Sequence, residues 1–396
     1  MRVPIAAWFL VGLCGLWAGG LSAEGATWSA EAPGAASSYG SRSAEANNQG
    51  VREAQAGRFE QGIALLRQSL SLDPSDAQVK KNLSGVLTDW AVRLEQQGQL
   101  DQAVSALQEA VGLDPDNGKA LVLLGDYAYV SDEDLSRAVA FWKRAHGKVP
   151  DAKWVLVSER LSQAERDLAI ERGFYSVQTQ HFTVRLEAEE GAGKDQHLGE
   201  ALEQEYARLE KLLGPAPARF TVIVYAERNF RRVAGQRDWA VGLYDGRIRV
   251  RLDDLGSDRI QPVIAHELAH AFLAQTYGPM VPIWVHEGFA QFFQESPTQD
   301  RRPLEPFVLW AAKASWIPLK WLDHHFQQPS SREDLGRAYF QAWVVFGFLV
   351  RQAGMDSLKR FLAALQAGQP VDRAFDGAFA PLRWARVDGG SLEAAY

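Results

Sequence analysis

The sequence predicts a multidomain chain with an N-terminal all-α solenoid of repeated helix pairs, followed by an α+β domain. Three observations predict this division. A similar pattern of residues recurs from Gly57, Gly98 and Glu133. Beyond Arg172 the spacing of apolar residues changes from the helical period to the alternation typical of strands. Near residue 266 a largely apolar helical segment then carries a compact set of histidine and glutamate side chains.

The composition is that of an ordinary globular protein, with 46% hydrophobic and 23% charged residues. The net charge of −7 argues against a nucleic acid as partner. Residues 1–23 are typical of a signal peptide, because Arg2 precedes an apolar run and then small residues. We therefore expect an exported protein, periplasmic or secreted. A membrane contact is expected only if this segment is retained as an anchor in the inner membrane.

Residues 24–43 are rich in Ala, Gly and Ser and indicate a flexible linker. The only cysteine, Cys14, lies before it, inside the predicted signal peptide. Without that segment the protein has no cysteine, so no disulfide is expected in the mature chain.

Residues 44–172 contain the repeats. Apolar, small and proline positions correspond between the three copies: Phe59, Leu100 and Leu135; Gly62, Ala103 and Ala138; Pro74, Pro115 and Pro150. The pattern resembles the tetratricopeptide repeat, a helix–turn–helix unit of about 34 residues. The longer first interval predicts one lengthened helix over Asp76–Gln97, and Asp151–Arg172 is the expected capping helix. Two interpretations remain open, a docking groove for a protein partner and a rigid spacer.

The second domain is expected to span residues 174–385, followed by a tail over 386–396. Its predicted strands are 181–186, 220–225 and 246–252, with a helix over 195–213 between the first two. In the third strand Arg247, Arg249 and Arg251 alternate with apolar residues. Further helices are predicted over 306–315, 335–352, 355–367 and 371–379.

The central motif is His266-Glu267-Leu268-Ala269-His270, an HExxH sequence on a predicted helix. Residues four apart lie on one helix face, so His266 and His270 can direct both imidazoles at one zinc ion. Glu267 lies beside them, where its carboxylate can act as a general base toward water. A catalytic zinc ion usually takes a third protein ligand. His286 and Glu287 both suit zinc, and their spacing leaves the choice between them open.

HELAHA followed by PIWVHEGFAQ resembles the gluzincin metallopeptidases, specifically the peptidase MA-like domains of bacterial exported proteins. The resemblance covers about half the chain and implies a zincin-like fold with one Zn²⁺ per chain. It also implies His266, His270 and Glu287 as metal ligands, Glu267 as catalytic base, and a peptide or protein as substrate.

Three further expectations come from the resemblance. Related domains have a tyrosine near position 339. The Tyr339 hydroxyl is therefore expected to stabilise the tetrahedral oxyanion that forms when water attacks a peptide carbonyl. Gln291 stands where relatives have an acid, and its amide is expected to accept the N–H of a ligand histidine. The strand over 246–252 is expected at the sheet edge, either pairing with an extended substrate or preventing aggregation through its arginines.

The sequence therefore predicts an exported zinc metallopeptidase whose repeats dock a partner or substrate. The alternative is a weakly active or inactive zinc-binding scaffold that acts through its repeats. A second alternative is an enzyme that cleaves a cell-wall peptide.

Overall fold

The computed structural model of the chain describes residues 38–131, 135–187, 195–216, 219–234, 242–252, 260–278, 280–294 and 316–379. The predicted signal peptide, most of the predicted linker, the predicted helix 306–315 and the C-terminal tail lie outside these residues. Backbone contacts divide the chain into two compact units, with the division between Ala169 and Ile170. The predicted division after Arg172 lies a few residues further along.

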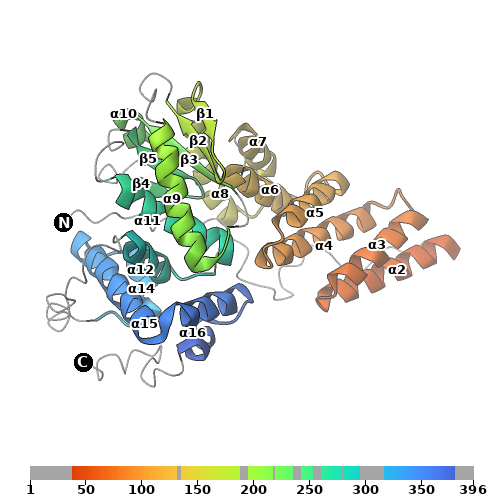
Figure 1. The fold of residues 1–396 in the computed structure, drawn as a ribbon. Coiled ribbons are helices and arrows are strands. Elements are labelled where there is room, and N and C mark those ends of the chain that lie inside the picture. The colour runs from red at the N-terminus through yellow and green to blue at the C-terminus, as the bar shows by residue number, and fades with distance from the viewer. Residues whose placement is uncertain are drawn as a thin grey trace. The chain divides into compact units, whose positions relative to one another are not determined.

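The N-terminal unit consists of helix pairs followed by one further helix (Figure 1). Its helices are α2 (Ser38–Gln55), α3 (Phe59–Leu72), α4 (Ala77–Gln96), α5 (Leu100–Leu113), α6 (Gly118–Ser131), α7 (Leu135–Ala145) and α8 (Asp151–Ile170). The lengthened helix predicted over Asp76–Gln97 is confirmed as α4, with the Asp76 side chain accepting the N–H groups of Gln78 and Val79. The expected capping helix is confirmed as α8.

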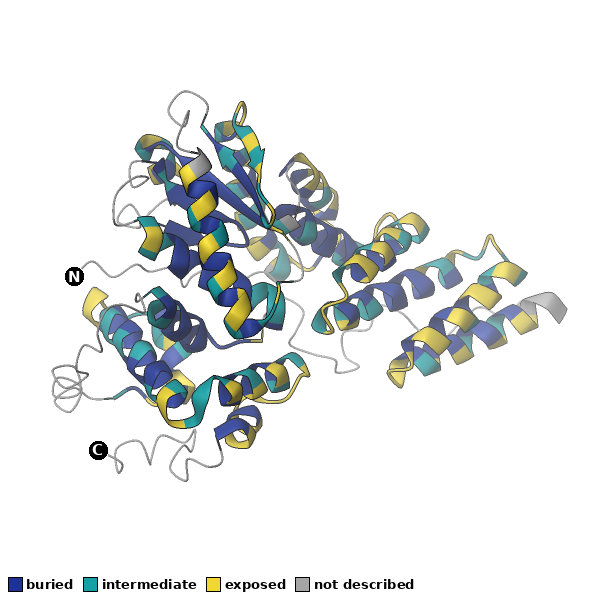
Figure 2. Cartoon of the chain, in the orientation of Figure 1, coloured by how far each residue is buried: buried dark blue, intermediate teal, exposed yellow. Residues whose placement is uncertain are grey.

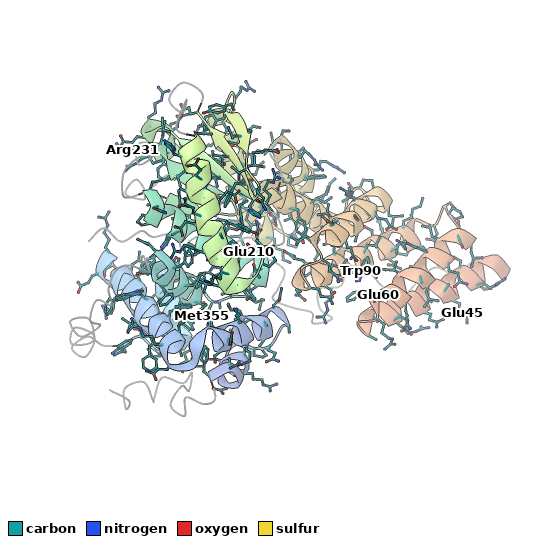
Figure 3. The ribbon with its side chains drawn as sticks, in the orientation of Figure 1. Glu45, Glu60, Trp90, Glu210, Arg231 and Met355 are labelled. Atoms are coloured by element: carbon teal, nitrogen blue, oxygen red, sulfur yellow. The ribbon has the colours of Figure 1, made fainter. Side chains whose placement is uncertain are left out.

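Small residues bring the paired helices together. A Cβ atom on Gly62 in α3 would lie 2.8 Å from the Gly50 carbonyl oxygen in α2, a distance only glycine permits. The equivalent Ala103 and Ala138 are fully buried. The prediction that these positions allow close helix approach is thus confirmed. Figure 3 shows the side chains along these helices, among them Trp90 of α4, which packs against the buried cluster of this unit.

One boundary prediction is wrong. The first repeat helix begins at Ser38, inside the predicted linker, rather than at Ala44. Ser43 explains why this polar segment is helical: its side chain is buried and donates to the Ser69 carbonyl, while the Ser69 hydroxyl donates to the Ser43 carbonyl at 2.8 Å. Packing against α3 therefore decides the local structure here, whereas the composition alone suggested a linker.

The C-terminal unit contains a five-stranded mixed sheet in the order β1-β2-β3-β5-β4. Its strands are β1 (Tyr175–Gln178), β2 (Phe182–Leu186), β3 (Phe220–Tyr225), β4 (Gly242–Tyr244) and β5 (Ile248–Arg251). β2, β3 and β5 run parallel, and the outer strands β1 and β4 run antiparallel to their neighbours. Its helices are α9 (Asp195–Leu213), α10 (Glu227–Ala234), α11 (Ile260–Tyr277), α12 (Ile283–Gln294), α14 (Leu319–Gln327), α15 (Arg332–Gln366) and α16 (Val371–Phe379).

Both faces of this sheet are covered, as the alternation along β3 shows (Figure 2). Val222 and Val224 join the large core that includes α9 and α11, whereas Ile223 and Tyr225 join a smaller cluster with Phe230 of α10. β3 is therefore a nearly continuous run of apolar residues, as expected for a strand that is buried on both faces.

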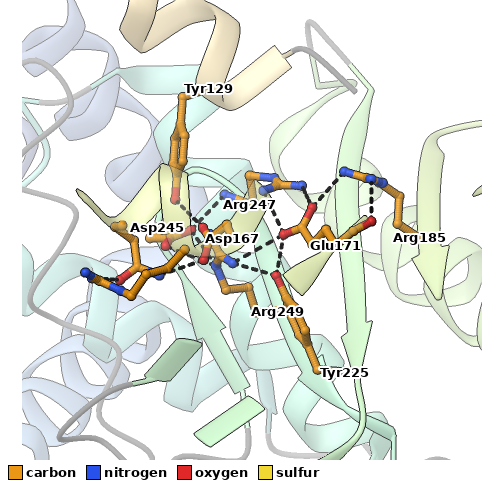
Figure 4. Close-up of polar contacts among 10 residues, drawn as sticks. Tyr129, Asp167, Glu171, Arg185, Tyr225, Asp245, Arg247 and Arg249 are labelled. Carbon is orange, nitrogen blue, oxygen red and sulfur yellow. Dashed lines mark hydrogen bonds and ion pairs between the residues drawn. The ribbon is translucent and has the colours of Figure 1, made fainter. Parts of the chain in front are cut away.

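The arginine-bearing strand is not at an edge, which contradicts the prediction. β5 pairs with β3 on one side and β4 on the other, and Arg247 and Arg249 are completely buried. Figure 4 shows the reason: Glu171 accepts hydrogen bonds from Arg247, from Arg185 and from the Tyr225 hydroxyl. Glu171 and Arg247 lie 76 positions apart in the sequence, and their ion pair covers the arginine face of this strand.

Arg249 completes this network. Its Nε donates to both oxygens of Asp245 at 3.1 Å, and its Nη1 donates to the Tyr225 hydroxyl at 2.6 Å. Burial raises the pKa of Glu171, but the charges of Arg247 and Arg249 and the hydrogen bonds outweigh it and hold that pKa below its usual value. The network ties the segment after α8 to β5, the strand that precedes α11.

Candidate metal centre

Helix α11 presents the HExxH motif from the middle of the core. Every residue from Ile264 to Leu273 is buried, so this middle part of α11 is covered all round, in contrast to an amphipathic surface helix. The Nε2 atoms of His266 and His270 lie 3.1 Å apart, facing one another. The two imidazoles therefore converge on one point, as the motif predicts.

Glu287 of α12 completes a three-sided site. Its Oε2 lies 3.7 Å from Nε2 of His266 and 3.7 Å from Nε2 of His270. The two Nε2 atoms and Glu287 Oε2 form a triangle, and the point equidistant from all three lies about 2 Å from each atom. This is the length of a zinc–nitrogen or zinc–oxygen bond. These three side chains form the metal-ligand group found within the described residues. The donor set and its size thus fit a zinc ion.

The structure places His286 beside this group and outside it. The His286 and His270 ring centroids are 5.8 Å apart, and His286 is buried. Successive helix residues point about 100° apart, which explains why only one of the two neighbours reaches the common centre. Of the two alternatives left open by spacing, Glu287 has the ligand geometry.

Helix α12 is held by two contacts that the motif alone did not reveal. The Asp323 carboxylate of α14 accepts the backbone N–H groups of Ile283 and Trp284 at the start of α12. Directly after Glu287, a Cβ on Gly288 would lie 2.6 Å from the Ala342 carbonyl oxygen and 2.6 Å from Phe346 Cβ. Glycine is therefore needed for α12 to lie close against α15.

Tyr339 of α15 reaches the same site. Its hydroxyl donates to Oε1 of Glu287 at 3.4 Å, and its ring contacts Phe326 edge-on with centroids 4.9 Å apart. Figure 1 shows α12 and α15 adjacent in the C-terminal unit. The predicted tyrosine thus lies at the three-residue group that could hold a metal ion, where it contacts the Glu287 carboxylate.

Glu267 lies under the outer strand of the sheet. A Cβ on Gly242 of β4 would lie 2.7 Å from Val263 Cγ1 and 2.8 Å from Glu267 Oε1, so a larger residue there would displace these side chains. β4 is the last strand of the sheet among the described residues, so an outer strand lies next to the HExxH motif. A three-residue strand gave no alternation signal from which this could be predicted.

The prediction for Gln291 is wrong. Its amide donates to the Tyr339 backbone carbonyl at 3.2 Å and so links α12 to α15. The Nδ1 of His266 lies instead 2.9 Å from Oε1 of Gln294, one turn further along α12. Gln294 is seven residues after Glu287 and shares its helix stripe, which is the signal that could have identified it.

Burial dominates the electrostatics of the site. It raises the pKa of Glu267 to about 8, with a further contribution from the nearby charge of Asp245, and raises the pKa of Glu287 well above its usual value. It lowers the pKa of His266 to about 4 and that of His270 well below its usual value. Oε2 of Glu267 and Oε2 of Glu287 are buried and have no hydrogen-bond partner among the described residues. A divalent cation would stabilise both charged carboxylates and use the neutral imidazoles as ligands.

Comparison with known protein families supports the prediction of tetratricopeptide repeats. The tetratricopeptide repeat family matches residues 88–153, from the second half of α4 to the start of α8. No curated protein matches the chain in a sequence comparison. The chain is thus mostly helical, with a tetratricopeptide-repeat match at residues 88–153 inside a helical repeat-like N-terminal region, and such repeats generally bind protein partners. Among the described helices, none combines the length and apolar character needed to span a membrane.

Proposed function

We propose that the protein is a zinc metallopeptidase of the gluzincin type that hydrolyses a peptide or protein substrate. The observation that carries the proposal is the convergence of His266, His270 and Glu287 on one point, with Glu267 buried beside them. When bound, zinc would polarise the scissile carbonyl and make a water molecule more acidic.

Glu267 and Tyr339 would have separate roles in the reaction. Glu267 would take a proton from the attacking water and pass it to the leaving amine. Without a cation, burial raises the pKa of Glu267 to about 8. The positive charge of a bound zinc ion would lower that pKa and keep the carboxylate ionised, as a base requires. Tyr339 would turn its hydroxyl from Glu287 toward the substrate oxyanion, since its 3.4 Å contact with the carboxylate is a weak one.

The outer strand β4 offers the means of holding an extended substrate. A peptide added beside Gly242–Tyr244 would lie next to Glu267, because Gly242 contacts that side chain. Among the described strands β4 is paired with β5 alone, so we place an extended substrate against the opposite side of β4, next to Glu267.

The substitution Glu267→Gln tests the proposal. It removes the base and keeps both histidine ligands, so we expect one zinc ion per chain in both proteins and loss of peptidase activity only in the variant. Elemental analysis and digestion of an unbiased peptide library measure the two properties. Full activity of the variant would contradict the hydrolytic mechanism.

The second candidate function is a binding scaffold, which the matched repeats at residues 88–153 favour. On this hypothesis the C-terminal unit binds zinc but does not cleave peptides. The same library digest separates the two functions: zinc-loaded wild-type protein without activity would favour the scaffold. Export to the periplasm, proposed from residues 1–23, is tested by fractionating cells that express the full chain.

A further inference from the structure

The two histidines of the motif differ in the hydrogen-bond partner of their Nδ1 atoms. Both turn Nε2 toward the common point, so Nδ1 lies on the edge away from it. His266 has an amide oxygen at this edge, Oε1 of Gln294. For His270 the described residues provide no hydrogen-bond partner to Nδ1, although the atom is buried. A ligand histidine ordinarily donates this N–H to an acceptor, which fixes its tautomer and ring orientation.

His286 lies beside His270, and its Nδ1 likewise lacks a hydrogen-bond partner among the described residues. This atom is also buried. The two ring centroids are 5.8 Å apart and the rings are tilted by 31°. Two buried polar atoms on neighbouring rings each cost stability unless something pairs them.

The separation fits one intervening water molecule. Ring nitrogens lie about 1.1 Å from an imidazole centroid, so nitrogens of the two rings are separated by between roughly 3.5 and 8 Å. This range exceeds a direct hydrogen bond and includes the roughly 4.5 to 5.8 Å that two hydrogen bonds through one water molecule span. One water molecule can accept from one nitrogen and donate to the other across such a gap. A neutral imidazole supplies the donor in His270 and the acceptor in His286.

We propose that His286 is the positioning residue of His270, acting through a water molecule shared by their Nδ1 atoms. One turn of α12 then serves both sides of the centre: Glu287 supplies a ligand, and His286, about 100° around the helix, orients a ligand on α11. The role of His286 parallels that of Gln294 toward His266, with a ring and water in place of a direct amide contact. This inference rests on the proposed metal centre.

The test compares zinc affinity in the full chain, by competition with a chelator, for wild type, His286→Phe and His286→Gln. Phenylalanine keeps a ring and removes the acceptor, so we expect zinc to bind about 10- to 100-fold more weakly. Glutamine keeps an acceptor, and its affinity should stay within about threefold of wild type. Gln294→Ala should match His286→Phe, and the exposed His197→Phe should match wild type.

A second readout follows the His270 ring directly. In zinc-loaded protein labelled with ¹⁵N-histidine, the His270 Nδ1–H resonance should be protected from exchange in wild type and His286→Gln, and lost in His286→Phe. Wild-type affinity together with a protected resonance in His286→Phe would overturn the inference. If His286→Phe does not fold, a loss of more than tenfold in His286→Gln would overturn it too. Wild-type protein that takes up no zinc would instead overturn the metal centre itself.

Discussion

The contact at Gly288 gives a direct way to displace one wall of the centre. In Gly288→Ala the new Cβ would lie 2.6 Å from the Ala342 carbonyl oxygen and 2.6 Å from Phe346 Cβ, whereas ordinary contacts begin at 3.4 Å. Helices α12 and α15 must therefore separate by roughly 0.8 Å, and both neighbouring residues are buried, so little space is available to absorb the shift. Overpacking of this kind costs about 1–3 kcal/mol of unfolding free energy.

The same shift should weaken zinc binding. Metal–ligand distances tolerate changes of only about 0.2 Å, and Glu287 directly precedes the displaced glycine. We expect at least a tenfold weaker zinc affinity in Gly288→Ala, measured by chelator competition, together with the lower stability measured by urea unfolding. Gly336→Ala is the matched control: it lies in α15, meets no atom within 4 Å, and should be neutral or stabilising by up to about 1 kcal/mol. Equal stability and zinc affinity in the two variants would refute this reasoning.

Two further predictions concern stability. Glu171→Gln removes the carboxylate shared by buried arginines, so the free energy of unfolding should fall by about 3–5 kcal/mol. The control Glu109→Gln breaks the exposed pair with Arg67 and should lower the free energy of unfolding by less than about 1 kcal/mol. Similar small losses in both variants, measured by urea unfolding, would contradict the network's importance. Burial raises the pKa of Asp126 to about 6 despite its pairing with Arg160, so the folded state favours the protonated form, and stability is lost as pH rises from about 4 through 6. The free energy of unfolding of Asp126→Asn, relative to wild type, should therefore rise by up to about 3 kcal/mol between pH 4 and pH 7. If the difference in unfolding free energy between the two proteins does not change with pH, the pKa of Asp126 is not raised.

Much of the fold follows from local sequence patterns. Helices such as α9 and α16 have the predicted limits because their apolar stripes and flanking glycine or proline residues are local features. The kink in α15 at Gly354, where φ is 78°, separates the two predicted helices 335–352 and 355–367 for the same reason. β1 and β4 have only four and three residues, too few alternations to distinguish them from loops, whereas the four residues of β5 lie within the longer alternating segment 246–252.

The errors at the site arise from long-range pairing. Alternation in β5 correctly separated its arginines from its apolar residues, but Glu171 and the strand β4 determine that the arginine face is buried. Gln291 and Gln294 are both on the stripe of Glu287, and only the packing of α12 on α15 decides which amide reaches a histidine. The ligand spacing on α11 was predictable because an i, i+4 pair is a property of one helix.

Zinc competition titrations on wild type and Glu287→Ala test the central claim most directly. We predict one tightly bound zinc ion per wild-type chain, and a loss of affinity by orders of magnitude in Glu287→Ala, because a three-ligand site becomes a two-ligand site. The loss should exceed that of His286→Phe, since a ligand contributes more than the residue that orients one. Unchanged zinc affinity in Glu287→Ala, or no zinc bound by the wild-type protein, would contradict the account.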